Sequence, residues 1–96
     1  MTQAAAPSNA DIIMYSTTWC GYCVRLRSQL DRAGISYSVI DIEQDDIAAA
    51  WVELANGGNR TVPTLRFADD SALTNPSVIA VQAHLAKLAA KATTHE

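Results

Sequence analysis

Two cysteines, Cys20 and Cys23, stand where the periodicity of the chain changes. Residues 11–15 form an apolar, β-favouring run before them, and residues 23–33 carry apolar side chains at helical spacing after them. The pair therefore lies where a strand turns into a helix, and the first N–H groups of a helix have no intrahelical partner. A thiolate at Cys20 accepts hydrogen bonds there, so we expect its pKa to fall below the free-thiol value of about 8.5. Cys23 lies on the same helix face, within reach of Cys20 for a disulfide.

The composition describes one small domain and argues against several classes of protein. Its 96 residues, 49% of them hydrophobic, are enough for a single core. A net charge of −3 without a basic run argues against nucleic acid as a partner, and no apolar stretch approaches the roughly 20 residues that span a membrane. Residues 1–10 lack the pattern of a signal peptide, so we expect a disordered lead-in to a domain at 11–92. In the expected cytoplasm structural disulfides are rare, which makes a close cysteine pair catalytic or metal-binding.

The succession of strand and helix patterns predicts an α/β fold. The expected elements are strand 11–15, helix 23–33, strand 35–42, helix 45–55, strand 64–68, strand 71–74 and a last helix that Asn75 caps and Pro76 begins. The order is β-α-β-α-β-β-α. The first two strands are joined through a helix and should pair in parallel, and the last two should form a hairpin. A four-stranded mixed sheet with three helices covering both faces follows.

Apolar residues at helical spacing mark the face that each helix should bury. These residues are Leu26, Leu30 and Ala33 in the first helix, Ile47, Ala50, Trp51 and Leu54 in the second, and Val78, Val81, Leu85, Leu88 and Ala89 in the third. Gly34 should end the first helix and segment 56–59 the second, because Gly and Asn tolerate left-handed backbone. Residues 93–96 are expected to be a frayed tail.

Cys-x-x-Cys at the first strand–helix turn of such a unit is the pattern of thioredoxin-like redox proteins. Residues 15–23 and 61–64, at their separation, resemble the glutaredoxin family, and the resemblance extends over about residues 11–90. Within this family the chain most resembles the mycoredoxins, the members linked to mycothiol. The segments that carry this closer resemblance are 19–23, 57–64 and 73–77. The resemblance implies a thioredoxin/glutaredoxin-like fold and a cytoplasmic thiol–disulfide oxidoreductase.

The same resemblance implies roles for individual residues. Cys20 would be the nucleophile and Cys23 the resolving thiol, and the Val62–Pro63 bond would be cis and face the pair. The residues expected to bind the thiol are Thr17, Trp19, Tyr22, Arg60, Thr61, Val62 and Pro63. No bound cofactor is expected, and mycothiol is the thiol co-substrate. The implied partners are mycothiolated proteins and an upstream NADPH-dependent disulfide reductase, and the implied state is a monomer.

Departures from the glutathione-binding pattern favour mycothiol. Thr17 occupies the position of a lysine common in glutathione-binding members, and the Asp69-Asp70 region stands where many have Gly-Gly followed by an aspartate. Glutathione carries two carboxylates and an ammonium, so a site for it needs placed charges, such as Arg25 or Arg60. Mycothiol, a cysteine joined to an amino sugar and inositol, is largely neutral. The groove expected for it is lined by Thr17, Thr18, Tyr22 and Asn59.

Other functions stay open at this point. A redoxin that donates electrons to ribonucleotide reductase, itself reduced by a thioredoxin reductase, shares the fold. An iron–sulfur cluster carrier would use Cys20 as a ligand, although such relatives commonly lack the second cysteine. A zinc site needs about four ligands, and only His84 and His95 remain beside the cysteines. Trp19 either packs against the fold or shields the cysteines, and Trp51 is expected in the core.

Overall fold

The computed structural model describes residues 12–94. Its strands are β1 Ile13–Ser16, β2 Ser38–Asp41, β3 Thr64–Arg66 and β4 Ala72–Thr74, and its helices are α2 Gly21–Arg32, α3 Asp46–Ala55 and α4 Val78–Thr94. This order confirms the predicted β-α-β-α-β-β-α succession, although the strands are shorter than expected. The expected lead-in, residues 1–10, lies outside the described residues, so the domain bounds of 11–92 stay a prediction.

The four strands form one mixed sheet in the order β2-β1-β3-β4. β1 pairs in parallel with β2, in a register that sets Ile13 opposite Ser38. β3 runs antiparallel to both β1 and β4, and it pairs with β1 so that Tyr15 lies opposite Thr64. Both the parallel pair joined through α2 and the β3–β4 hairpin are therefore confirmed. β1 lies inside the sheet, and the chain leaves its end directly toward the cysteines.

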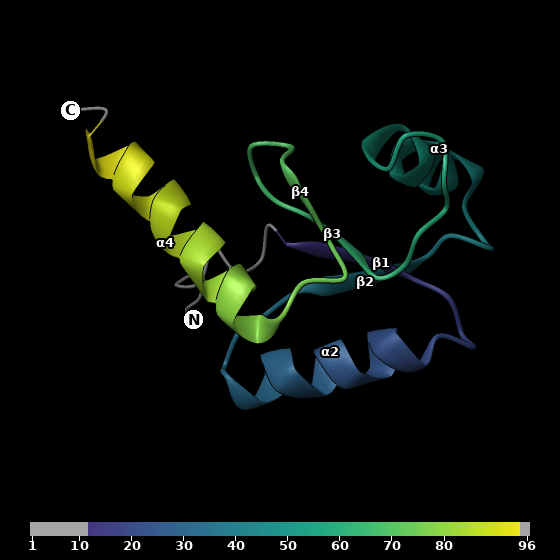
Figure 1. Ribbon diagram of the computed structural model, residues 1–96, viewed down its shortest axis with the longest axis horizontal. Helices are drawn as coiled ribbons and strands as arrows, with labels where there is room; N and C mark the ends of the chain where they lie inside the picture. Colours follow the sequence, from purple (N-terminus) through teal and green to yellow (C-terminus); the bar gives the residue numbers. More distant parts are fainter. Residues whose placement is uncertain (1–11, 95–96) are drawn as a thin grey trace, which may run out of the picture.

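The sheet separates two hydrophobic cores, and α2 and α4 lie on the face opposite α3 (Figure 1). Side chains alternate along β1, since successive residues of a strand point to opposite faces. Met14 packs with Leu26 and Leu30 of α2, whereas the next residue, Tyr15, packs with Val52 of α3. Helices on both faces were expected, and one strand thus anchors both layers.

The predicted buried face of α3 is wrong. Ile47 and Leu54 are 85% and 81% exposed, and Ala50 is exposed as well. The helix instead turns its small residues inward, and those that are buried are Ala48, Ala49 and Val52. The Tyr15 ring, with its centroid 5.2 Å from that of the half-buried Trp51, already fills much of this core. Small side chains let the helix approach that ring, which the apolar pattern of the helix alone does not reveal.

The start of α4 also differs from the prediction. Asn75 has a φ of 46°, whereas an N-cap residue normally has extended backbone, and its N–H donates to the Pro63 carbonyl at 2.8 Å. Ser77 supplies the cap, because its hydroxyl accepts from the Ala80 N–H at 3.1 Å. The helix continues to Thr94, so the expected fraying does not begin at residue 93. Ala89, placed on the buried stripe by its spacing, is exposed.

α2 carries the cysteine motif and begins two residues earlier than expected, at Gly21. Its buried residues are Cys23, Leu26 and Leu30. Ala33, expected on this face, is the exposed C-cap residue. Gly34 follows with a φ of 75°, as predicted for the residue that ends the helix.

Candidate active site

Cys20 is the N-cap residue of α2, with extended backbone at φ −86° and ψ 108°. Its Sγ accepts the Cys23 N–H at 3.1 Å, which satisfies one of the free donors of the first turn. Cys20 and Cys23 form a disulfide with their Cα atoms 5.2 Å apart. The first turn of α2 contains no acidic residue, so nothing on this turn opposes the positive end of the helix dipole. This sulfur position stabilises a negative charge.

The loop before β3 lies directly against the cysteine pair. The Val62–Pro63 peptide bond is cis, as the resemblance implied, and the Val62 carbonyl oxygen lies 3.8 Å from Cys20 Sγ. Pro63 is buried and has no N–H, so it does not compete for a thiolate. The Thr64 hydroxyl donates to the Thr61 carbonyl at 2.7 Å, and this hydrogen bond stabilises the turn of residues 61–64.

Two aromatic side chains flank the pair at the surface. Trp19 is 69% exposed, and its indole N–H donates to a carboxylate oxygen of Glu43 at 2.9 Å. The ring therefore does not pack in the core, which decides against one of the two expectations for it. Tyr22, between the cysteines, is 62% exposed, as expected. Both cysteines themselves are buried, at 5% and 1% exposed.

A hollow of about 270 Å³ lies beside Tyr22, between α2 and the connection from β4 to α4. It is lined by Tyr22, Arg25, Leu26, Gln29, Asn75, Pro76 and Ser77. In the sequence, segment 73–77 carried part of the family resemblance and its Asn-Pro-Ser run was interpreted as the start of a helix, so these residues were not expected at the site. The polar run directly after a strand was the available signal. This wall combines amide and hydroxyl groups with apolar side chains and one cation, Arg25.

The Asp69-Asp70 turn, expected to replace a glutathione-binding element, lies elsewhere. A carboxylate oxygen of Asp70 is 2.9 Å from an Arg66 guanidinium nitrogen, and Arg66 is paired with Ile13 at the beginning of β1. Cys20 follows the other end of β1, so the turn and the cysteines lie at opposite ends of the sheet. The Arg66 pKa is raised, first by its hydrogen bond to the Tyr15 hydroxyl and then by Asp70. The turn therefore says nothing about thiol choice.

Thr17 does not line an open groove. The residue is 7% exposed, and its hydroxyl has no hydrogen-bond partner within the part of the chain that the structure describes. Ser16, the last residue of β1, is also buried, so the chain is still below the surface when it reaches Thr17. Thr18 and Asn59 are exposed, as residues that line a groove must be. Thr17, which occupies the position of the lysine common in glutathione-binding members, is buried.

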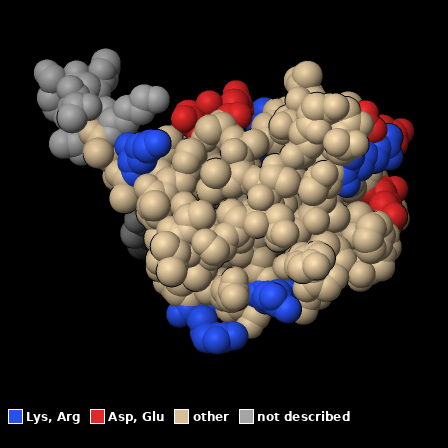
Figure 2. All heavy atoms as spheres, in the orientation of Figure 1, with Lys and Arg blue, Asp and Glu red and all other residues tan. Residues whose placement is uncertain are grey.

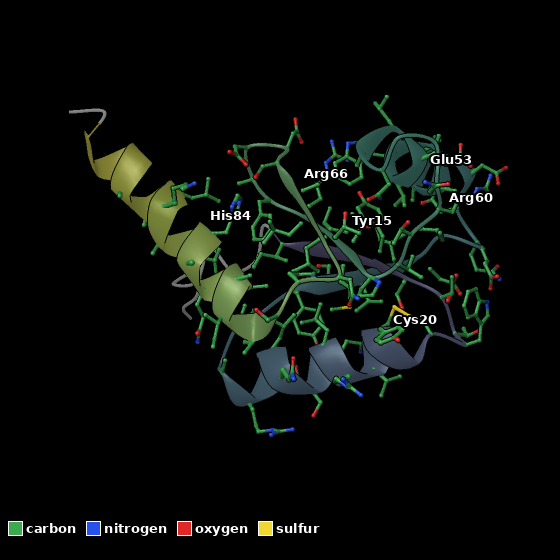
Figure 3. The ribbon with its side chains drawn as sticks, viewed as in Figure 1. Tyr15, Cys20, Glu53, Arg60, Arg66 and His84 are labelled. Carbon is green, nitrogen blue, oxygen red and sulfur yellow. A yellow bond between two sulfur atoms is a disulfide. The ribbon has the colours of Figure 1, made fainter. Side chains whose placement is uncertain are left out.

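Arg60 forms an ion pair with Glu53 of α3 (Figure 3). The hydrogen bond that Arg60 donates to Glu53, followed by the negative charge of Glu53, raises the pKa of the Arg60 guanidinium above its ordinary value. Arg60 directly precedes Thr61 and the cis loop, so its charge lies near the site but is already matched. The expectation that Arg60 binds the thiol stays a prediction, and its guanidinium already has a defined partner in Glu53.

The remaining polar side chains do not assemble a metal site. Within residues 12–94, no group of three or more His, Cys, Asp and Glu side chains has the arrangement needed to hold a metal ion. His84 lies against Phe67, with ring centroids 4.4 Å apart, and its Nε2 is 2.7 Å from the Ser71 hydroxyl. In the same part of the chain, none of the helices combines the length and the apolar character needed to cross a membrane.

Comparison with known proteins identifies the family. The glutaredoxin family model matches residues 12–71. A candidate glutaredoxin of Mycobacterium tuberculosis is 52% identical over 80 residues, which are 83% of this chain and 95% of the relative. The chain belongs to the glutaredoxin family. Mycoredoxin 1 of Corynebacterium glutamicum is 42% identical over 80 residues, 83% of this chain and 99% of that protein.

A solved structure supports the fold. The glutaredoxin from Methanosarcina mazei Go1 superposes with a TM-score of 0.69, covering 80% of this chain and 79% of that chain, at 18% identity. As a glutaredoxin, the protein is a thiol–disulfide oxidoreductase. Its structure brings together Cys20, Cys23, Val62 and Pro63, with Tyr22 at the rim, and leaves Thr17 inside and Arg60 tied to α3.

Proposed function

We propose that this glutaredoxin reduces mixed disulfides between proteins and mycothiol, with Cys20 as the nucleophile and Cys23 as the resolving thiol. The observation that carries the chemistry is the position of Cys20 Sγ, which accepts the Cys23 N–H at the start of α2. The same environment that satisfies a sulfur lone pair stabilises the thiolate of the reduced enzyme. The similarity to mycoredoxin 1 over nearly its whole length supports mycothiol as the thiol.

The proposed exchange proceeds in balanced steps. The Cys20 thiolate attacks the mycothiol sulfur of the mixed disulfide, the old S–S bond breaks, and the protein leaves as a thiolate that takes up a proton. Cys20 then carries mycothiol in a new disulfide. A second mycothiol thiolate attacks the mycothiol sulfur of that disulfide, which releases oxidised mycothiol, a disulfide of two mycothiols, and restores the Cys20 thiolate. An NADPH-dependent disulfide reductase returns oxidised mycothiol to two thiols by delivering two electrons.

The polar groups around the site suit mycothiol. Arg60, the cation nearest the cis loop in sequence, is matched by Glu53, and a surface ion pair leaves little charge for a ligand carboxylate. Arg25 lines the hollow beside Tyr22 and forms no ion pair within the described residues, so it is the one charge there that a glutathione carboxylate would meet. The hollow beside Tyr22 offers amide and hydroxyl groups from Asn75, Gln29 and Ser77. Sugar and inositol hydroxyls pair with such groups directly or through water. We further propose that the protein acts in the cytoplasm as a monomer on mycothiolated proteins.

The test compares matched mixed disulfides of one small thiol with mycothiol and with glutathione. We expect kcat/KM to favour mycothiol by roughly tenfold to a hundredfold, because a missing charge-assisted hydrogen bond costs about 1.5–3 kcal/mol. Cys20→Ser should abolish turnover, whereas Cys23→Ser should keep much of it because an external thiol resolves Cys20. Equal kcat/KM for both thiols would remove the mycothiol assignment, and a dead Cys23→Ser would remove the monothiol route.

A second route is favoured by one observation, the disulfide between Cys20 and Cys23. In this route the Cys23 thiolate attacks Cys20, displaces the bound thiol and closes the internal disulfide. Such a dithiol protein could serve ribonucleotide reductase and be reduced directly by a thioredoxin reductase. Turnover with NADPH and thioredoxin reductase, without mycothiol, would establish this route, and no turnover under these conditions would exclude it.

A further inference from the structure

The solvent face of α2 concentrates positive charge. Of the seven Lys and Arg residues of the chain, three lie on this helix, and those three are Arg25, Arg27 and Arg32. Positions 21, 25, 28 and 32 follow one another at helical spacing and form a single exposed row. The row begins at Gly21, the residue after Cys20, and leads away from the cysteines along the helix to Arg25 and then to Arg32.

These arginines are not neutralised by the rest of the described chain. Within residues 12–94 the ion pairs are Arg60 with Glu53 and Arg66 with Asp70, and neither involves α2. Arg32 donates to the uncharged Ser28 hydroxyl at 3.1 Å. The one acidic residue on the helix, Asp31, accepts from the Tyr37 hydroxyl at 2.8 Å and keeps its charge, so α2 carries three arginines against one carboxylate. The positive charge of the row therefore faces solvent.

The opposite flank of the cysteines is acidic. Four carboxylates lie within residues 41–46, and they are Asp41, Glu43, Asp45 and Asp46. Glu43 holds the indole of Trp19, the residue before Cys20, so this acidic segment reaches the site. Figure 2 shows Lys and Arg along the lower edge, over α2, and Asp and Glu at other edges of the same view. The acidic segment 41–46 therefore reaches the cysteine pair through Glu43, whereas the arginine row leads away from the pair along α2.

We propose that the arginine row of α2 is the docking surface for acidic side chains of the protein whose mixed disulfide is reduced, an inference that rests on the proposed function. The whole chain has a net charge of −3, so an acidic partner is repelled by most of the molecule and attracted by this row. The acidic flank at 41–46 repels the same partner, which leaves one orientation over Cys20. Exposed Tyr22 and Val24 add apolar contact at the end nearest the cysteine.

The test separates docking from thiol exchange through Arg32, which lies roughly 18 Å along the helix from Cys20 at 1.5 Å per residue. Two peptides are used as substrates, each with a single cysteine in a disulfide with mycothiol. In the Glu peptide this cysteine is flanked by glutamates, and in the Lys peptide it is flanked by lysines. At low ionic strength we expect Arg32→Glu to lower kcat/KM on the Glu peptide about fivefold and not on the Lys peptide. Lys87→Glu, an equal charge change on an exposed residue of α4, should leave both values unchanged. High salt should abolish the difference, because the Debye length falls to about 3 Å at 1 M.

Further measurements separate a docking effect of Arg32 from an effect on thiol exchange. A small mixed disulfide without a peptide should react equally with wild-type protein and Arg32→Glu. The same two peptides are also prepared with glutathione in place of mycothiol. If mycothiol is the wrong thiol, the effect of Arg32→Glu on the Glu and Lys peptides is still measured with these substrates. Equal losses on the Glu and Lys peptides, no loss on the Glu peptide, or a loss with Lys87→Glu as large as with Arg32→Glu would overturn the proposal. Binding of a fluorescent single-stranded DNA at physiological salt that depends on Arg32 would also overturn it, in favour of a nucleic acid.

Discussion

The reactivity proposed for Cys20 depends on a few backbone groups. The Cys23 N–H points at Cys20 Sγ, and the other approaching backbone group is the carbonyl of Val62 at 3.8 Å. The first turn of α2 has no carboxylate to oppose a thiolate. By contrast, Cys23 is 1% exposed within the core, and burial disfavours its charged form. Two thiols three residues apart are therefore expected to ionise over different ranges of pH.

Alkylation of the reduced protein tests this difference. The rate at Cys20 should rise with a midpoint below the free-thiol pKa of about 8.5, because only the thiolate reacts. As the pH falls through that lowered pKa, the Cys20 thiolate is protonated and its reactivity is lost. Cys23 should titrate at or above the free value. Iodoacetamide labelling followed by mass spectrometry, with Cys23→Ser and Cys20→Ser as single-thiol references, measures both. A midpoint near 8.5 for Cys20 would remove the helix-start explanation.

Thiol choice is also tested at single residues. Glu53→Gln should release Arg60, whose guanidinium then becomes available to a glutathione carboxylate. We expect kcat/KM for glutathione mixed disulfides to rise about tenfold, while the value for mycothiol changes little. The matched control is Glu53→Gln combined with Arg60→Gln, in which the gain should disappear. An unchanged ratio between the two thiols would mean that Arg60 takes no part in choosing them.

Among the helices, α3 shows how packing overrides pattern. Apolar residues occur almost all round it, from Ile47 to Leu54, so its sequence does not single out one face. The sheet presents the Tyr15 ring to it, and the helix turns Val52 and its alanines to that ring. Ile47 and Leu54 remain in solvent as a consequence.

Truncation at two positions of α3 checks this rotation. Val52→Ala should lower the free energy of unfolding by about 2 kcal/mol, because Val52 is fully buried. Ile47→Ala should change it by less than about 0.5 kcal/mol, since Ile47 is 85% exposed. Urea denaturation monitored by circular dichroism gives both values. If Ile47→Ala proved the more damaging change, the helix would have to be rotated as its apolar spacing suggested.

For the molecule as a whole, the two cores share one strand. β1 pairs with both β2 and β3, and its adjacent residues Met14 and Tyr15 serve opposite faces. If the helices on one face leave the sheet, one face of β1 is exposed to solvent. The strand is then destabilised, and the core on its other face loses the surface against which it packs. The Pro63 carbonyl also accepts the Asn75 N–H, which links the cis loop to the start of α4.

This arrangement predicts a single cooperative unfolding transition. Leu30→Ala, in the core under α2, should destabilise the fold by about 2–5 kcal/mol. In a Trp19→Phe background, fluorescence reports Trp51 beside α3, and far-UV circular dichroism reports all helices. Both probes should shift by the same amount in Leu30→Ala, as two-state unfolding requires. Transitions that separate, with Trp51 unaffected, would show that the two layers unfold independently.

Which elements form, and in what order, follows from the amino-acid sequence, because element type obeys short-range rules. The spacing of apolar residues, Gly34 after the first helix and the turn between β3 and β4 all act over a few residues. The placement of Cys20 at the start of a helix follows from the same local rules. The family resemblance added the cis bond at Pro63, which no local propensity indicates.

The tertiary structure alone decided how the elements face one another. The buried side of α3 depends on the Tyr15 ring, which lies 30 residues or more away from it in sequence. Asn75 does not cap α4, because its backbone is left-handed at φ 46° where its N–H meets the Pro63 carbonyl, and Ser77 caps the helix instead. The ion pair of Arg60 with Glu53, 7 residues before it, depends on how the loop after α3 folds back toward the helix. Such contacts join different elements and leave no periodic pattern in the sequence, so they are known only from the tertiary structure.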